Sequence, residues 1–162
     1  MSASINKTST SDTRPPFRIR PGRRGDVEAI SNLLVELGYP QGADMATVHW
    51  VISHPETETI IAADTADRPV GLLTLSHRPQ LRMRGRIITI DELVVQPAWR
   101  RRGVARELVK KAMERAKVLS AKRVELLMPR DNEGALAFCR SLGLTEAQVS
   151  VMRVQSIDFE RP

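Results

Sequence analysis

Apolar and polar positions follow two different periods along this chain, and the changes of period divide it into elements. Alternating or continuous runs of aliphatic residues predict strands over residues 17–20, 59–63, 70–75, 86–95, 124–128 and 149–154. Apolar residues spaced three and four apart predict helices over residues 26–37, 45–52, 104–116 and 132–142. The resulting order, β-α-α-β-β-β-α-β-α-β, is typical of an α/β fold in which helices cover the faces of a mixed sheet.

Local signals at the ends of these segments support the division. Asp26 stands where the N-cap of the first helix is expected, and Gly38 follows the last apolar position of that helix. The first residues of the chain are rich in Ser and Thr and poor in apolar side chains. We therefore expect residues 1–16 to form a disordered tail and residues 17–162 to form a single domain.

The composition excludes several classes of protein. With 162 residues, of which 41% are hydrophobic and 27% charged, the chain can bury one sizeable core. No apolar run approaches the roughly 20 residues that cross a bilayer, and the first residues lack the apolar segment of a secretory signal. The single cysteine, Cys139, excludes an intrachain disulfide, and three scattered His provide no metal-ligand set with it. These features predict a cytoplasmic protein that binds neither a membrane nor a metal.

The net charge of +6 is concentrated rather than diffuse. Residues 100–123 hold ten basic and two acidic side chains, a net charge of +8, whereas residues 25–99 hold five basic and ten acidic ones, a net charge of −5. Aromatic residues make up only 4% of the chain, so stacking platforms for nucleic acid are scarce. The pattern favours one polyanionic ligand over nucleic acid, which stays a weaker alternative for the basic segments.

The basic segment opens with a loop that has the chemistry of an anion site. The loop and the first turn of the helix after it comprise Arg100, Arg101, Arg102, Gly103, Val104, Ala105 and Arg106. The first N–H groups of a helix lack intrahelical partners and carry the positive end of the helix dipole, so they suit a pyrophosphate. Gly103 allows the backbone to approach the phosphates, Ala105 keeps the first turn small, and the arginines add charge at the rim.

Two motifs in this half of the chain resemble those of the GNAT superfamily of acyl-CoA-dependent N-acetyltransferases. Arg100, Gly103 and Ala105 fit the family pattern Arg/Gln-x-x-Gly-x-Gly/Ala. The run Asn132-x-x-Ala-x-x-Phe-Cys139-x-x-x-Gly-Leu, which starts 27 residues after Ala105, is similar to the second family motif, Asn-x-x-Ala-x-x-Phe-Tyr-x-x-x-Gly-Phe. The predicted order of elements also agrees with the family. The resemblance implies acetyl-CoA as co-substrate.

The resemblance further implies that the central sheet is splayed. The strands predicted over residues 86–95 and 124–128 would part, and the pantetheine arm of acetyl-CoA would lie between them. The arm would hydrogen bond to the backbone of Leu93, Val94 and Val95. A backbone N–H near Val94 or Val95 would stabilise the oxyanion that forms when an amine attacks the thioester directly.

Two adjacent acids, Asp91 and Glu92, precede the end of that strand, and members of the family often carry an acid at one of these positions. Adjacent residues of a regular strand face opposite sides, so only one of the two would address the site unless a bulge redirects the other. Either acid could draw a proton from the amine through water, and either could instead be a surface or ion-paired acid.

The second motif departs from the family at Cys139, where a tyrosine proposed to protonate the departing thiolate is common. A thiol can donate a proton, but Cys is shorter than Tyr, and a small buried apolar filler is the favoured interpretation. Asn132 has two interpretations: the family implies a contact with the pantetheine arm, and its position before a helix favours an N-cap.

In the family layout the acceptor binds near the first two helices and the nearby strand ends. The negative charge of residues 25–99 suits a cationic small-molecule or peptide amine. Candidate contacts are Tyr39, His49, Trp50 and His77, although helical spacing favours core packing for His49 and Trp50. A homodimer is frequent in such families, but the sequence indicates no interface.

We therefore expect an N-acetyltransferase that moves the acetyl group of acetyl-CoA to a primary amine. The alternative is a non-catalytic acyl-CoA-binding or sensing module with the same fold, which the missing tyrosine motivates.

Overall fold

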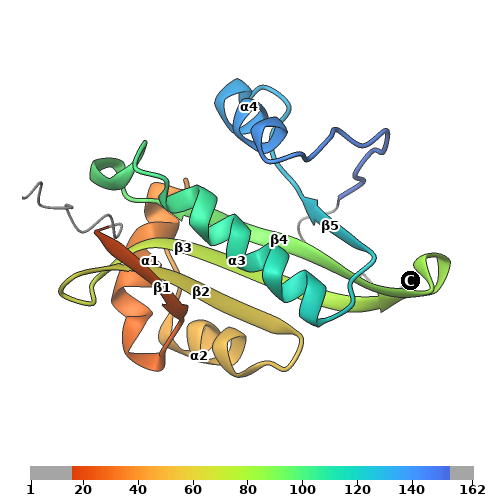
Figure 1. Cartoon of the computed structure of the whole chain (residues 1–162). Helices are drawn as coiled ribbons and strands as arrows, with labels where there is room; N and C mark the ends of the chain where they lie inside the picture. Colours follow the sequence, from red (N-terminus) through yellow and green to blue (C-terminus); the bar gives the residue numbers. More distant parts are fainter. Residues whose placement is uncertain (1–15, 154–162) are drawn as a thin grey trace, which may run out of the picture. The chain divides into compact units, whose positions relative to one another are not determined.

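A five-stranded sheet in the order β1-β2-β3-β4-β5 forms the centre of the computed structural model, which describes residues 16–153 (Figure 1). The strands are β1 (Phe17–Pro21), β2 (Thr57–Asp64), β3 (Pro69–Gln80), β4 (Gly85–Val95) and β5 (Arg123–Leu126). Neighbours from β1 to β4 are antiparallel, and β5 is parallel to β4, so the sheet is mixed as predicted. The chain divides into two compact units, of which the first ends at Leu127 and the second begins at Met128.

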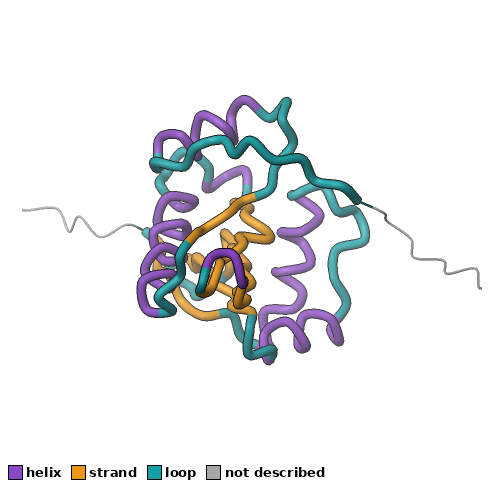
Figure 2. The backbone as a smooth tube through the Cα atoms, turned by 90° about the vertical axis from the view of Figure 1, so that its right-hand side faces the viewer, coloured by secondary structure: helices purple, strands orange, loops and turns teal. Residues whose placement is uncertain are grey.

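Three of the four helices within residues 16–153 belong to the first unit. The helices are α1 (Val27–Glu36), α2 (Met45–Ser53), α3 (Val104–Val118) and, in the second unit, α4 (Glu133–Ser141). Three short 3-10 turns complete the elements of the described part of the chain: η1 (Arg24–Asp26), η2 (Leu81–Met83) and η3 (Pro97–Trp99). In Figures 1 and 2, α1 and α2 lie on one face of the sheet and α3 lies on the other. No helix in residues 16–153 is long and apolar enough to cross a bilayer.

The face toward α1 and α2 carries an apolar row across three strands. Ile61, Leu72 and Val94 lie in register on β2, β3 and β4. They form one buried cluster with Ile30 and Leu33 of α1. Full burial of each such side chain stabilises the fold by about 1.5–3 kcal/mol, so this row fixes which residues of β4 face the two helices.

The opposite face lies close to α3 because β3 has a glycine at the contact. A Cβ atom at Gly71 would be 3.0 Å from Cγ1 of Val104 and 3.2 Å from Cδ1 of Leu108. Any larger residue would therefore push the start of α3 away from the sheet. The close approach fixes the N-terminus of α3 next to the end of β4.

A buried ion pair connects β1 to the start of α1. Arg20 donates from Nη1 to Oδ2 of Asp26 at 2.8 Å and from Nη2 to Oδ1 at 2.9 Å, and both side chains are less than a tenth exposed. Asp26 occupies the N-cap position of α1 as predicted, but its carboxylate makes no cap bond there and instead accepts from Arg20 and the N–H of Arg23. The carboxylate of Asp26 therefore binds the buried guanidinium of Arg20 rather than the N–H groups at the start of α1.

The second unit holds α4 and the segment that follows it. The strand predicted over residues 149–154 is wrong as far as it is described, since residues 149–153 form no strand and residue 154 lies outside the described range. Val149 and Val151 are 67% and 58% exposed, so their alternation with polar residues buries neither side chain. Residues 1–15 of the expected tail also lie outside the described range.

Candidate active site

β4 and β5 stay paired over only part of their length. The parallel ladder runs from Ile87 opposite Arg123 to Ile90 opposite Leu126. β4 continues to Val95 and remains paired with β3 on its other side. Within the described residues, the edge of β4 beyond Ile90 therefore has no pairing with β5, which agrees with the parting of these strands expected from the sequence.

The antiparallel ladder decides which backbone groups of β4 face this open edge. The N–H of Gln96 donates to the carbonyl of Val70 at 2.9 Å, so Gln96 belongs to a hydrogen-bonded pair with β3. Such pairs recur at every second residue, so Val94 directs its N–H and C=O toward β3, whereas Leu93 and Val95 direct theirs to the open edge. In agreement, the carbonyl of Val95 accepts from Nε of Arg100 at 3.0 Å.

A β-bulge brings both acids of β4 to the same face of the sheet. Thr74 pairs with Glu92 and the next residue, Leu75, pairs with Ile90, so Asp91 is the extra residue. The carboxylate of Asp91 accepts a hydrogen bond from Ser76, which shares its face of β3 with Thr74. This is the face toward α1 and α2. In a regular strand, adjacent residues face opposite sides of the sheet. Because of the bulge, Asp91 and Glu92 can both reach a site on the face toward α1 and α2.

The surroundings of the two acids favour their protonated forms. Desolvation raises the pKa of the half-buried Glu92, and the negative charge of Asp91 raises this pKa further. Partial desolvation also raises the pKa of the more exposed Asp91, while the hydrogen bond from Ser76 opposes the rise. Among residues 16–153, neither carboxylate has an ion-pair partner. Two uncompensated carboxylates at a sheet edge are suited to accept a proton from a cation.

Glu92 also stands at the end of a row of hydroxyl groups. Thr59 of β2, Thr74 of β3 and Glu92 lie in register across three strands. Both threonines are more than nine-tenths buried, and neither hydroxyl has a hydrogen-bond partner within the described part of the chain. This row was not predicted from the sequence, although the alternation of Thr74 and Ser76 with Leu73 and Leu75 in β3 was a signal for a polar strip on one face.

The loop before α3 has the geometry of an anion site. Gly103 adopts a left-handed φ of 82°, and nothing lies within 4 Å of the position that a Cβ atom would occupy there. The N–H of Glu107 donates to the carbonyl of Gly103 at 3.1 Å and begins the helical bonding. The N–H groups before Glu107 therefore have no partner from the helix itself. Val104 is buried, so it offers a ligand only its backbone.

The arginines of this loop make contacts with the protein itself. Arg100 binds the carbonyl of Val95 and lies 3.9 Å from a carboxylate oxygen of Glu36. The guanidinium of Arg102 lies 5.2 Å from the centre of the Trp99 ring. Arg101 adopts a left-handed φ of 64°, which turns the backbone into the loop. The exposed Arg106 lies in the first turn of α3. The arginines thus hold the conformation of the loop through these contacts and also give it positive charge.

Asn132 and Cys139 belong to the second unit. The side-chain oxygen of Asn132 accepts from the N–H of Ala135 at 3.1 Å, which is the N-cap interaction that its position suggested. Cys139 is buried in α4, and desolvation raises the pKa of its thiol. The first unit therefore holds the acids, the open edge of β4 and the loop before α3, while Asn132 caps α4 and Cys139 lies within it.

The four candidate acceptor contacts are not gathered at one place. Tyr39 and Trp50 are 59% and 67% exposed, so the core packing favoured for Trp50 was wrong. Val48 and Ile52, one turn apart, form the inner side of α2, and Trp50 lies midway between them on the outer side. Half-buried His49 contacts the carbonyl of Arg24 rather than the core cluster.

His77 lies on the face opposite to the two acids. It is buried on β3, and its Nδ1 is 2.6 Å from a guanidinium nitrogen of Arg86. Desolvation lowers the pKa of His77, and the charge of Arg86 lowers it further. Because His77 is an odd-numbered position of β3, its side chain faces away from those of Thr74 and Ser76.

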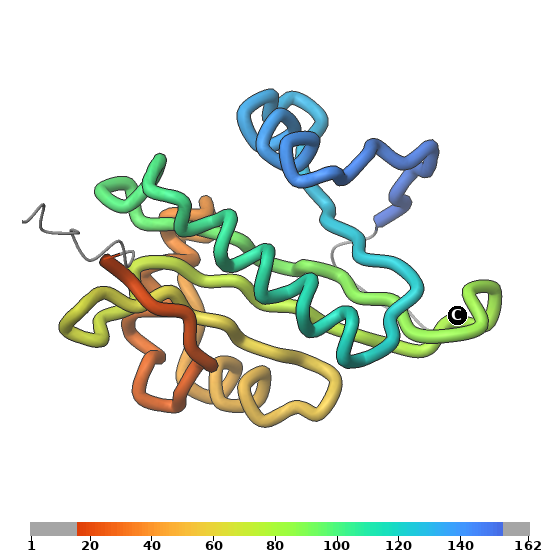
Figure 3. The backbone as a smooth tube through the Cα atoms, viewed as in Figure 1, coloured from red at the N-terminus to blue at the C-terminus, as the bar shows by residue number. Residues whose placement is uncertain are grey.

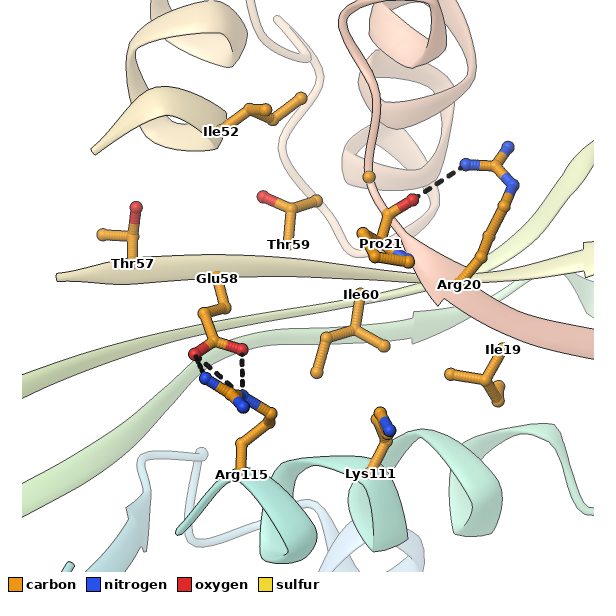
Figure 4. A pocket seen from close by; sticks show the side chains of 11 residues that line it. Ile19, Arg20, Pro21, Ile52, Thr57, Glu58, Thr59, Ile60, Lys111 and Arg115 are labelled. Atoms are coloured by element: carbon orange, nitrogen blue, oxygen red, sulfur yellow. Dashed lines mark hydrogen bonds and ion pairs between the residues drawn. The ribbon is translucent and has the colours of Figure 1, made fainter. Parts of the chain in front are cut away.

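A separate hollow of about 480 Å³ lies beyond the end of β1 (Figure 4). Glu58 points from β2 toward α3, where it accepts from Nε of Arg115 at 2.7 Å, whereas Thr57 and Thr59 point to the other side of the strand. The hollow does not include the acids of β4. Among the described residues there is also no group of three His, Cys, Asp or Glu side chains that could hold a metal ion.

Comparisons with known proteins agree with this geometry. Residues 27–144 match the model of the acetyltransferase (GNAT) family. The chain is similar to an uncharacterised N-acetyltransferase of Methanocaldococcus jannaschii, with 30% identity over 101 residues, which are 62% of this chain and 44% of that protein. The chain thus matches less than half the length of this relative.

Solved structures with low sequence identity share the fold. A transcriptional regulator from Bacillus halodurans C-125 has a TM-score of 0.78 and 24% identity, covering 86% of this chain and 99% of that one. An aminoglycoside 6′-N-acetyltransferase from Acinetobacter baumannii has a TM-score of 0.74 and 20% identity, covering 87% and 99%. A ribosomal-protein-alanine N-acetyltransferase from Brucella melitensis biovar Abortus 2308 has a TM-score of 0.72 and 18% identity, covering 86% and 99%. Because the family match over residues 27–144 spans more than half of the sequence, this chain belongs to the acetyltransferase (GNAT) family.

Proposed function

We propose that this chain is an N-acetyltransferase that transfers the acetyl group of acetyl-CoA directly to a primary amine. The observation that carries the proposal is the position of the bulge at Asp91. It places two carboxylates of raised pKa where the open edge of β4 begins. A co-substrate site and a base for the acceptor are then supplied by one strand. We further propose that residues 17–162 act as one domain.

Acetyl-CoA would bind along β4 and at the start of α3. The outward N–H and C=O groups of Leu93 and the outward C=O of Val95 are suited to the amide groups of the pantetheine arm, because they continue the hydrogen-bonding pattern of a strand edge. The pyrophosphate would lie at the N–H groups around Gly103, where there is open space for it. Arg101 and Arg106 are exposed and would add positive charge at the rim.

In the transfer the nitrogen of the neutral amine attacks the thioester carbon. The new C–N bond forms, the C–S bond breaks, the sulfur leaves as a thiolate, and the nitrogen releases its extra proton to solvent to give the neutral amide. The outward N–H of Val95 is the candidate donor to the oxyanion, because Val94 directs its N–H toward β3. The amine must first lose its ammonium proton, and the acids on the α1 and α2 face would accept it directly or through water.

Glu92 is the better candidate for the base. It is the more buried of the two acids, and both desolvation and the charge of Asp91 raise its pKa toward the range in which a general base is effective. Asp91 is more exposed and is engaged by Ser76, so it is suited to hold the cation near Glu92. Solvent would protonate the departing thiolate, since the buried thiol of Cys139 and its raised pKa favour a packing role.

A screen of acetyl-CoA turnover across classes of amines, followed by release of the free CoA thiol, tests the proposal. We expect acetyl-CoA to bind in calorimetry and at least one class of primary amines to be acetylated. The acetylated nitrogen should be identified by mass spectrometry. Binding of acetyl-CoA without turnover of any amine would instead favour the non-catalytic acyl-CoA-binding module, for which the cysteine at position 139 is the specific argument.

A further inference from the structure

The face of β3 that meets the two acids continues into a basic arm. Thr74, Ser76 and Arg78 occupy alternate positions of β3 and therefore share this face. Thr74 lies opposite Glu92, and the hydroxyl of Ser76 binds Asp91. The exposed Arg78 follows two residues later. Its Cα atom is thus about 7 Å from that of Ser76 and about 13 Å from that of Thr74 along the strand.

Arg78 begins a hairpin that extends past the rest of the sheet. The outermost pair between β2 and β3 joins Thr57 to Ser76, and the outermost pair between β4 and β5 joins Ile87, which lies opposite Arg78, to Arg123. Beyond Arg78, β3 and β4 run on as a two-stranded arm (Figure 3). Residues 78–86 contain four arginines and no acid. They account for four of the five basic residues between positions 25 and 99, so the sequence average over that range hid a strongly basic arm inside an acidic region.

The charges on this face are not neutralised within the described residues. Arg78 has no ion-pair partner there, and neither has Arg82, whose Nε lies 3.4 Å from the amide oxygen of Gln80. Arg123 at the start of β5 differs, because its Nε is 2.9 Å from a carboxylate oxygen of Glu125. The same face therefore presents an unpaired guanidinium a short distance from the two unpaired carboxylates of β4.

A second feature marks the carboxylate end of this face as a binding place. The hydroxyl of Thr74, opposite Glu92, is more than nine-tenths buried and has no hydrogen-bond partner among residues 16–153. Buried polar groups are normally satisfied, and those that are not are often found where a ligand binds. The carboxylates are thus accompanied by a hydroxyl that a bound amine or its water could satisfy.

We propose that the acceptor is an extended peptide whose N-terminal amine lies at Asp91 and Glu92 and whose acidic side chain, two to four residues further on, binds Arg78. This inference rests on the proposed acetyl transfer. A peptide strand advances about 3.3 Å per residue, so the 7–13 Å along β3 corresponds to an acid at position 3, 4 or 5 of the peptide. A guanidinium binds a carboxylate through two parallel N–H donors, which gives direction as well as affinity.

The arrangement disfavours acceptors that carry several positive charges. A polyamine long enough to fill the same face would bring its second ammonium next to Arg78 and the other arginines of the arm. Like charges at this separation repel, whereas an acid at this place neutralises the guanidinium. The cationic acceptor suggested by the average charge of residues 25–99 is therefore restricted to one reacting amine with an anionic group beside it.

Peptide binding provides the direct test. Six-residue peptides with a free N-terminus, a fluorophore at the C-terminus and Glu at position 3, 4 or 5 are compared with their Gln counterparts by anisotropy, with CoA present. We expect at least one Glu peptide to bind about fivefold or more tightly than its Gln counterpart, the upper range for an exposed charge pair. The preference should disappear in Arg78→Glu and persist in Lys117→Glu, which makes the same charge change on α3. Equal binding of all Glu and Gln peptides to the wild-type chain would overturn the inference.

Turnover of the same peptides separates this inference from the proposed function. If CoA is released equally with Glu and Gln peptides, acetyl transfer stands and the role of Arg78 is refuted. If Glu peptides bind preferentially through Arg78 but release no CoA, the peptide site stands and the proposed transferase activity fails. A change in kcat/KM for acidic peptides in Arg78→Glu, with kcat/KM for neutral peptides unchanged, supports both.

Discussion

Glu92 lies directly opposite Thr74 on β3, whereas its neighbour Asp91 has no counterpart in the ladder. This difference of one residue places two carboxylates on the same side of the sheet. It also explains why their pKa values rise together: each loses water, and Glu92 additionally experiences the charge of Asp91.

Substituting each acid in turn should show which of the two is the general base, because only loss of the base lowers kcat strongly. We expect Glu92→Gln to lower kcat by about 10²- to 10⁴-fold, the usual contribution of general base catalysis, with little change in acetyl-CoA affinity. Asp91→Asn should have a smaller effect. Because a base acts when deprotonated, kcat in the wild-type chain should rise with pH through a pKa above the ordinary glutamate value. A larger loss of kcat in Asp91→Asn than in Glu92→Gln would reverse the assignment.

The same substitutions should increase stability at neutral pH. The pKa of Glu92 is higher in the folded chain than in the unfolded chain, so the folded state binds the proton more tightly. Stability therefore decreases as the pH rises through the interval between these two pKa values. We expect Glu92→Gln to raise Tm at pH 7 by about 2–4 °C, the shift that one kcal/mol produces in a domain of this size. The advantage should vanish below the unfolded pKa, which thermal melts from pH 3 to 8 would show.

The loop before α3 is tested with a matched pair of glycines. Gly103 and Gly38 both have positive φ values, 82° and 106°, and at both the position that a Cβ atom would take has nothing within 4 Å. Glu at either position should cost about 1–2 kcal/mol of folding stability for the left-handed backbone. Only Gly103→Glu should abolish acetyl-CoA binding in calorimetry, because it places a negative charge at the proposed pyrophosphate site. Loss of binding in Gly38→Glu as well would indicate a global effect.

The buried ion pair between Arg20 and Asp26 should contribute far more to folding stability than the pair between Arg68 and Asp64, in which the guanidinium is exposed. Desolvation alone would raise the pKa of Asp26, but the hydrogen bonds from Arg20 and Arg23 lower it overall. Arg20→Met leaves the carboxylate buried without its main partner, and we expect a loss of about 3–5 kcal/mol in urea unfolding. Arg68→Met removes the partner of Asp64, and since that guanidinium is exposed the expected loss is only about 0–1 kcal/mol.

Cys139 provides a test of how the thiolate leaves. If solvent protonates the sulfur, Cys139→Ala should change kcat less than twofold and leave its pH dependence unaltered. Because the side chain is buried, the substitution should lower Tm instead, by creating a small cavity. A large loss of kcat at unchanged Tm would show that the thiol takes part in the reaction.

The helices and strands of the first unit could be predicted because the apolar residues of each follow the spacing of either a helix or a strand. Residues 86–95, for example, contain enough consecutive aliphatic positions to specify a buried strand, and the structure places β4 there. The loop before α3 could equally be predicted, since Gly103 immediately precedes a helix that follows a strand by a short loop. These features depend on neighbours in the sequence, and local periodicity reports such neighbours well.

The remaining features depend on partners that are distant in the sequence. The bulge at Asp91 exists only relative to the register of β3, and the buried position of Asp26 exists only because Arg20 reaches it from β1. The exposure of Trp50 follows from the orientation of α2, which Val48 determines by packing on the sheet. The basic arm at Arg78 was hidden because a charge average over a long segment ignores how the strands extend.

The bulge also makes one position of β4 unusually tolerant of a change in chain length. Elsewhere in a strand, loss of one codon would exchange the two faces for all residues on one side of the deletion. Loss of Asp91 would instead restore a regular ladder, in which Ile90 and Glu92 keep their present partners, Leu75 and Thr74. Descendants of this chain could therefore gain or lose the second carboxylate in a single step, and so alter acceptor choice, while the hydrophobic core stays as it is.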